Sequence, residues 1–395
     1  MKADQAWMVA AGACLLCVAA CSGGGDGNAA AGSVSDAVSG NGSTTSPPMQ
    51  SSAYAITNLV SDGAVPADSV DQDLKNPWGI AFDPLGPTWL ADNGTNLSTL
   101  YVDLGIKFPI TVSIPAGSSG PAQPTGIVYN GSLSEFMIGK AGAIGPAEFI
   151  YSGEGGTIAA WSELSLGNID MGAETMVDNG PAGAVYTGLA LAKNGSADFL
   201  YATDFHNARI DVFDNSFKPA TSAGGFIDPA LPAGYAPFGI QAVGDQLYVT
   251  YAPQQGPQNQ HEMFGAGLGL VDLFDASGTL VRRVASGGVL NAPWGIALAP
   301  ANFGQFGKDL LIGNFGDGTI NAFDPVTGQF IDNLRDASGE PLSIPGLWGI
   351  AFGNSLLAVS NWLYFAAGID DRADGLYGRI VASPSAGSGS SSSGG

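Results

Sequence analysis

The sequence predicts an all-β fold, a six-bladed β-propeller, on three observations. A motif in which an aromatic residue or Thr precedes a glycine recurs six times, and successive copies lie about fifty residues apart, the size of one four-stranded blade. Glycine and proline are abundant, with 59 and 24 residues in a chain of 395, which favours short strands and tight turns. Hydrophobic residues make up 45% of the chain, which suits a packed body.

The motif predicts the innermost strand of each blade. Glycine permits close backbone approach where these strands crowd around the central axis. We expect the bulky residues beside it, Trp78, Phe238, Trp294 and Trp348, to fill gaps between neighbouring blades, with stacking on a ligand as the alternative. The predicted inner strands are 77–82, 124–129, 186–191, 237–242, 293–298 and 347–352.

The other strands follow from short hydrophobic segments bounded by Gly, Asn and Asp. Third strands are predicted, for example, at 209–214 and 319–324, and weaker fourth strands at 110–114 and 280–285. The predicted second strands are 88–92, 148–152, 199–204, 246–251, 309–314 and 362–367.

The last blade lacks a fourth strand of its own, because its repeat runs out after a third strand at 376–381. Residues 55–60 form a strand-like segment before the first copy and belong to no other blade. We therefore expect this N-terminal strand to complete the sixth blade and close the ring, which removes an exposed sheet edge.

The N-terminus has the features of an export signal. An apolar run from residue 7 to 20 is shorter than a membrane-spanning helix and has the length of a signal-peptide core. It ends in Val18-Ala19-Ala20-Cys21, which resembles the bacterial lipobox and predicts lipidation of Cys21; an ordinary cleavage site before a Cys is the alternative. Cys14 and Cys17 lie in the same segment, so the body has neither a disulfide framework nor a cysteine zinc site.

This interpretation divides the chain into four regions. Residues 1–21 are a lipoprotein signal peptide with the lipidated Cys, 22–53 a flexible Gly/Ser/Ala tether, 54–382 the propeller and 383–395 a disordered Ser/Gly tail. The protein is expected to be exported and lipid-anchored in the bacterial cell envelope. Ser22, in place of an Asp, favours the outer membrane if the host is Gram-negative.

The net charge of −22 excludes a nucleic-acid partner, because no positive surface is available to displace phosphate counterions. Contact with a membrane is expected through the lipid anchor only. The remaining partners are an unknown protein, a glycan or a small molecule, bound by a protein that we expect to be a monomer.

Six segments of the chain carry a family resemblance: Asn58-Leu59-Val60-Ser61-Asp62, Asn76-Pro77-Trp78-Gly79, Ala91-Asp92-Asn93-Gly94-Thr95, Gly234-Tyr235-Ala236-Pro237-Phe238, Asn291-Ala292-Pro293-Trp294-Gly295 and Gly313-Asn314-Phe315-Gly316-Asp317-Gly318. They resemble an uncharacterised family of secreted bacterial NHL-like β-propeller proteins, over roughly residues 54–381. More distantly, the chain resembles the gluconolactonase and paraoxonase group, which implies calcium in the channel and hydrolysis of lactones or esters.

Five oxygen-bearing residues form the candidate metal site. Asp92, Asp204 and Asn314 end the second strands of three blades, and Glu154 and Asp370 lie near that place in two others. Carboxylates and amides converging on one face of a propeller would suit Ca²⁺. The alternative is that these residues only form turns.

Catalytic groups are scarce. His206 and His261 are the only histidines, so a metal centre that needs three imidazoles is excluded, and no G-x-S-x-G motif supports a serine hydrolase. The sequence leaves open whether the protein is an enzyme. It favours a binding or interaction module with an unassigned ligand, with a calcium-dependent lactonase or esterase at the channel mouth as the alternative.

Overall fold

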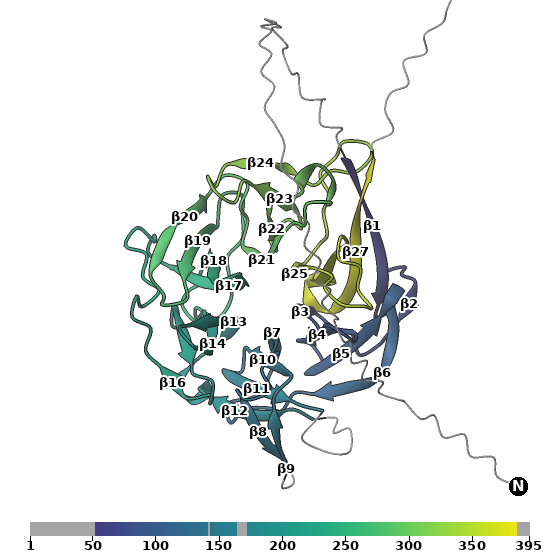
Figure 1. The fold of residues 1–395 in the computed structure, drawn as a ribbon. Helices are drawn as coiled ribbons and strands as arrows, with labels where there is room; N and C mark the ends of the chain where they lie inside the picture. Colours follow the sequence, from purple (N-terminus) through teal and green to yellow (C-terminus); the bar gives the residue numbers. More distant parts are fainter. Residues whose placement is uncertain (1–51, 141–142, 164–171, 385–395) are drawn as a thin grey trace, which may run out of the picture. The chain divides into compact units, whose positions relative to one another are not determined.

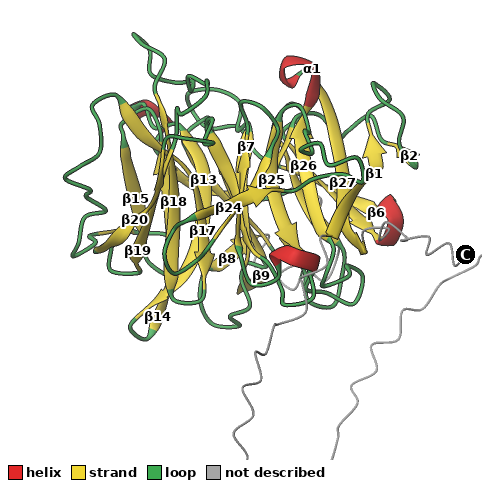
Figure 2. Ribbon diagram, turned by 90° about the horizontal axis from the view of Figure 1, so that it is seen from above, coloured by secondary structure: helices red, strands yellow, loops and turns green. Residues whose placement is uncertain are grey.

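The predicted ring of six β-sheets is confirmed (Figure 1). The computed structural model describes residues 52–140, 143–163 and 172–384. Figure 2 shows the strands running between two faces, each covered by loops. No helix among the described residues has both the length and the apolar character needed to cross a membrane.

The first three blades follow one another along the chain, each built from four antiparallel strands. A hairpin of β8 (Met137–Lys140) and β9 (Ala143–Pro146) is inserted in the second blade. Blade 1 consists of β3 (Pro77–Phe82), β4 (Thr88–Asp92), β5 (Leu97–Val102) and β6 (Ile106–Ser113). Blade 2 consists of β7 (Pro124–Tyr129), β10 (Phe149–Gly153), β11 (Thr157–Trp161) and β12 (Glu174–Asp178). Blade 3 consists of β13 (Tyr186–Asn194), β14 (Ala197–Asp204), β15 (Arg209–Phe213) and β16 (Pro219–Ala220).

Blades 4 and 5 repeat this arrangement, and all inner and second strands begin within two residues of their predicted positions. Blade 4 consists of β17 (Tyr235–Val243), β18 (Gln246–Pro253), β19 (Leu270–Asp275) and β20 (Leu280–Ser286). Blade 5 consists of β21 (Pro293–Leu298), β22 (Leu310–Asn314), β23 (Ile320–Phe323) and β24 (Phe330–Asn333). The described helical turns are η1 (Asp103–Gly105), η2 (Gly180–Ala182), η3 (Gly304–Phe306) and α1 (Ile369–Arg372).

The two ends of the propeller meet in blade 6, as predicted. Its first three strands are β25 (Leu347–Phe352), β26 (Leu363–Gly368) and β27 (Asp374–Pro384), and the N-terminal β1 (Ser52–Ser61) pairs antiparallel with β27. The short β2 (Ser69–Val70) adds a parallel strand outside β1. This pairing joins residues more than three hundred positions apart in sequence and ties the ring shut.

The motif glycines lie where inner strands of neighbouring blades touch. A Cβ atom on Gly79 would stand 2.6 Å from the carbonyl oxygen of Thr125 in blade 2, and one on Gly349 would stand 2.5 Å from the carbonyl oxygen of Trp78 in blade 1. Real Cβ atoms do not approach backbone this closely, so only glycine fits. The expected close approach around the axis is therefore confirmed.

The motif aromatics differ from our expectation, because they fill the central channel rather than the gaps between blades. Trp78 packs against Trp348, Trp294 and Phe238, with ring centroids 3.5, 5.9 and 6.5 Å away. These four residues form what we call the aromatic plug. The gaps between blades are filled by other residues, such as Trp89 and Phe149, which stack 4.0 Å apart between blades 1 and 2.

Candidate functional site

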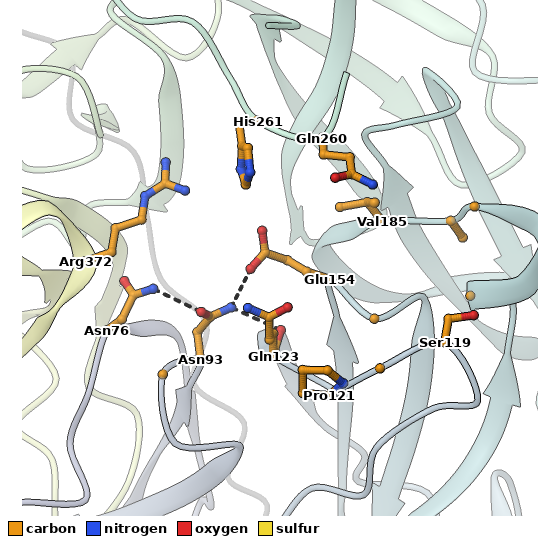
Figure 3. Close-up of a pocket in the computed structure, with 16 residues that line it drawn as sticks. Asn76, Asn93, Ser119, Pro121, Gln123, Glu154, Val185, Gln260, His261 and Arg372 are labelled. Carbon is orange, nitrogen blue, oxygen red and sulfur yellow. Dashed lines mark hydrogen bonds between the residues drawn. The ribbon is translucent and has the colours of Figure 1, made fainter. Parts of the chain in front are cut away.

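The upper face, on which inner strands begin and second strands end, carries a cleft of about 510 Å³ above the aromatic plug. We call this cavity the upper cleft. Its polar side chains come from loops of blades 1, 2, 4 and 6, because the blades bring residues that are distant in sequence around one axis (Figure 3). These side chains are Asn76, Asn93, Ser119, Gln123, Glu154, Gln260, His261 and Arg372.

A chain of hydrogen bonds crosses the floor of the upper cleft. The indole N–H of Trp348 donates to Asn76 Oδ1 at 3.0 Å, and Asn76 Nδ2 donates to Asn93 Oδ1 at 3.0 Å. Asn93 Nδ2 in turn donates to Glu154 Oε2 at 2.8 Å and to the carbonyl oxygen of Gln123 at 3.1 Å. Both asparagines are buried, so the chain fixes the Glu154 carboxylate at the edge of the open cavity.

Glu154 is the member of this chain that extends into the cavity. Figure 3 shows its carboxyl group in the space between Asn93, His261 and Arg372. One of its oxygens accepts from Asn93. The geometry thus combines a carboxylate acceptor with amide groups and an exposed imidazole around one small volume.

A loop of blade 4 forms the side of the upper cleft that carries His261. It is held by the backbone hydrogen bond from Gln255 N to the His261 carbonyl at 2.8 Å, and His206 Nδ1 lies 2.9 Å from the carbonyl oxygen of Gln258. The next residue, Glu262, is buried and pairs with the guanidinium of Arg372. Burial raises the pKa of the Glu262 carboxyl above its usual value, and Arg372 opposes that rise.

Arg372 divides the upper cleft from a second cavity of about 400 Å³ that lies beside it on the same face. We call this second cavity the aromatic pocket; its side-chain lining is Phe264, Phe315, Asp317, Ser343, Pro345, Asp370, Asp371 and Arg372. The three residues 370–372 have positive φ angles of 53°, 52° and 70°. Consecutive non-glycine residues in this region are strained and persist only when their surroundings hold them.

Three of the predicted metal ligands, Asp92, Asp204 and Asn314, accept backbone hydrogen bonds within their own blades. Asp204 Oδ1 accepts from the backbone N–H of Val185 at 3.1 Å, and its Oδ2 accepts from Asn207 Nδ2 at 2.7 Å. Asn314 Oδ1 accepts from the backbone N–H of Asn291 at 3.1 Å. The side chains of Asp204 and Asn314 thereby each link the segment before the inner strand of their blade to the end of the second strand.

Asp92 is completely buried in blade 1, where the backbone N–H of Thr99 donates to its Oδ2 at 2.9 Å. Its Oδ1 has no hydrogen-bond partner among the described residues. Burial raises the pKa of the Asp92 carboxyl well above its usual value, and the contact with Thr99 opposes the rise.

The remaining two predicted ligands reach cavities, but different ones. Glu154 lines the upper cleft and Asp370 lines the aromatic pocket. Across residues 52–140, 143–163 and 172–384, no group of three or more His, Cys, Asp or Glu side chains lies close enough to hold a metal ion. The calcium site stays a prediction, and Cys21 lies outside the described residues.

The sequence analysis did not assign a role to Asn76, Asn93, Glu262 or Arg372. Asn76 and Asn93 belong to two of the segments that carry the family resemblance, Asn76-Pro77-Trp78-Gly79 and Ala91-Asp92-Asn93-Gly94-Thr95, which was a usable signal. Glu262 and Arg372 lie on loops, where no periodicity indicates the direction of a side chain.

The opposite mouth of the channel is a separate hollow of about 400 Å³, and most of the residues that line it have aliphatic side chains. Inner-strand residues such as Ile80, Ile127 and Ile296 line it. Between it and the aromatic plug only a void of about 30 Å³ remains, so the two mouths do not form one open pore.

Comparison with known proteins gives curated viral relatives, of which two match most of this chain. No protein-family model matches the chain. The uncharacterized protein R648 of Acanthamoeba polyphaga mimivirus is 33% identical over 83% of this chain and 80% of its own length. The uncharacterized protein L690 of the same virus is 33% identical over 83% of this chain and 86% of its own length. These relatives give no support to the expected bacterial origin.

Solved structures with the same architecture are more distant in sequence. A glucose dehydrogenase aligns with 83% of this chain and all of its own length, at 14% identity and a TM-score of 0.50. The virginiamycin B lyase of Staphylococcus aureus aligns with 83% of this chain and 99% of its own, at 17% identity and a TM-score of 0.46. Similarity at this level concerns the propeller fold alone.

Proposed function

This chain belongs to the family of the uncharacterized mimivirus proteins R648 and L690, and we propose from the upper cleft that it is a binding protein for a small, hydroxyl-rich molecule of the saccharide class. The observation that carries the proposal is the hydrogen-bond chain from Asn76 through Asn93 to Glu154. It holds a carboxylate in a fixed orientation at the floor of a cavity, before any ligand arrives.

The chemistry of the cleft supports a ligand with many hydroxyl groups. A hydroxyl group both donates and accepts, so it pairs equally well with the Glu154 carboxylate and with the exposed amide of Gln260. The volume of about 510 Å³ lies within the range of small-molecule sites.

Binding of a saccharide panel, measured by calorimetry on the purified protein, tests this proposal. We expect at least one mono- or disaccharide to bind, and we expect Glu154→Gln to weaken that binding by at least about tenfold, the effect of losing a hydrogen bond to a charged group. Glu340→Gln, at an exposed position of blade 5, is the matched control. A panel with no binder, or equal binding by both variants, would refute the proposal.

A calcium-dependent lactonase or esterase is the second candidate. The observation in its favour is that Glu154 and His261 line the same cleft, and a carboxylate and an imidazole are groups that serve in acid–base catalysis. Turnover of a lactone and ester panel that disappears in Glu154→Gln and in His261→Ala would support this candidate over pure binding.

The location of the protein is also a proposal. We propose export and lipid anchoring through Cys21 in the bacterial cell envelope, on the strength of Val18-Ala19-Ala20-Cys21. Expression in bacteria with an alkyne-tagged fatty acid tests it. The wild-type protein should carry the label in the membrane fraction and Cys21→Ser should not; label on both, or on neither, would argue against the anchor.

A further inference from the structure

The aromatic pocket differs from the upper cleft because two phenylalanine side chains form part of its wall. Phe264 and Phe315 face its interior, with ring centroids 6.1 Å apart and an interplanar angle of 79°. Phe264 is 60% exposed and is the one exposed Phe, Tyr or Trp side chain in the described part of the chain. An aromatic ring left in solvent at the wall of a cavity offers its face to a ligand.

The rim of this pocket is negative. The side chains of Asp317, Asp370 and Asp371 line it and are exposed. Arg372 is the one cationic residue of the lining, and its charge is paired with buried Glu262. The balance of charge around the pocket therefore attracts cations, in a protein that carries a net charge of −22.

The protein's own arginine already places a cation against one of the two rings, that of Phe315. The Arg372 guanidinium carbon lies 4.7 Å from the centre of the Phe315 ring and 5.2 Å from that of Trp348. Both distances fall within the range of cation–π contacts. Phe315 itself stacks on Trp348 at 4.1 Å, so its ring is held in place by the aromatic plug.

We propose that the aromatic pocket is a second binding site and that it takes an organic cation, an alkylammonium or quaternary ammonium group. The group would lie against Phe264 and Phe315, while Asp370 and Asp371 would neutralise it from the rim. A bare metal ion fits less well, because aromatic walls supply none of the oxygen ligands that Ca²⁺ or Mg²⁺ needs. This site adjoins the saccharide site proposed for the upper cleft and shares Arg372 with it, but it takes a different class of ligand.

The test uses choline as probe and 3,3-dimethylbutan-1-ol, its neutral carbon isostere, as matched control. Binding to the purified protein can be followed by calorimetry and by tryptophan fluorescence, since Trp348 stacks on Phe315. We expect choline to bind at least about fivefold more tightly than the isostere, because only the charge differs. Added salt should weaken choline binding, since the rim carboxylates are exposed.

Three variants make the test specific. Phe264→Leu should weaken choline binding about fivefold while leaving the fold intact, because the ring is exposed. The double variant Asp370→Asn with Asp371→Asn should weaken it as well. Glu154→Gln should bind choline like the wild type, which separates this site from the upper cleft. Equal binding of choline and its isostere, no binding of choline, or unchanged binding in Phe264→Leu would overturn the proposal.

Discussion

The indole of Trp78 in blade 1 stacks on the indole of Trp348 in blade 6, with ring centroids 3.5 Å apart and ring planes 15° from parallel. Trp294 meets both rings edge-on at 5.9 Å. This contact closes the channel beneath the upper cleft and gives the Asn76–Asn93–Glu154 chain a rigid base, because Trp348 is also its first donor. The aromatic plug therefore links the stability of the propeller to the shape of the site.

Trp348→Ala should destabilise the protein by about 3–5 kcal/mol, as for large-to-small changes at other buried aromatic positions. The side chain is fully buried, and its removal also takes the indole donor from Asn76. Urea denaturation monitored by circular dichroism measures the loss. Leu356→Ala, at a position that is 78% exposed, is the control and should change stability by less than about 0.5 kcal/mol. A loss in Trp348→Ala no larger than in this control would contradict the plug.

Asp92→Asn should remove a pH dependence of stability. Burial raises the pKa of Asp92 in the folded state, so between the unfolded and folded pKa values the folded protein holds a proton that the unfolded chain has lost. Stability from this group is therefore present at low pH and falls as the pH rises through that window. We expect Asp92→Asn to be more stable than the wild type at pH 8, with the difference vanishing near pH 4. A variant that is less stable at both pH values would show that the carboxylate itself is needed.

Asp204→Ala should destabilise the protein by about 1–3 kcal/mol, because it leaves the buried N–H of Val185 without its acceptor. We expect the same loss with and without calcium, since the carboxylate oxygens already accept from N–H groups of this blade. Thermal unfolding with and without calcium provides the comparison. A calcium-dependent rise of the melting temperature in the wild type that is lost in Asp204→Ala would instead support the calcium site.

Arg372→Ala should leave the buried carboxylate of Glu262 without its partner. Removing one member of a buried ion pair is more damaging than removing both, so the double variant with Glu262→Gln should recover part of the lost stability. A double-mutant cycle by urea denaturation should give a coupling energy of about 1–3 kcal/mol. Additive losses in the two single variants would mean that the pair does not hold the strained turn at 370–372.

The fold could be predicted because its signal is periodic. A glycine such as Gly349 is required where a neighbouring backbone passes 2.5 Å from its missing Cβ. The same close approach occurs at the motif glycines of five blades, whereas at Gly188 in blade 3 the nearest backbone atom is 3.3 Å away. The role of β1 followed from counting strands, since blade 6 lacked one. The contact between Trp78 and Trp348 on the axis could not be predicted from the sequence. A motif gives the position of a side chain in its own strand but does not show which residues it contacts across the channel.

The site was predicted in part. Glu154 and Asp370 do line cavities, whereas Asp92 points into its own blade and its neighbour Asn93 faces the upper cleft. Asp92 is the last residue of β4 and Asn93 is the first residue of the turn after it, so an error of one residue at the strand end changes which side chain reaches the cleft. Arg372 escaped prediction because its direction depends on three unusual φ angles and on Glu262, more than a hundred residues away.

Calorimetric titration of the wild type, Glu154→Gln and Glu340→Gln with the saccharide panel tests the central claim most directly. The Gln side chain keeps an oxygen that can accept from Asn93, so the hydrogen-bond chain at the floor of the cleft is preserved and only the negative charge is lost. The account predicts one or more saccharides that bind to the wild type and to Glu340→Gln alike and at least about tenfold more weakly to Glu154→Gln. Saccharide binding that is the same in all three proteins, or found in none of them, would contradict it.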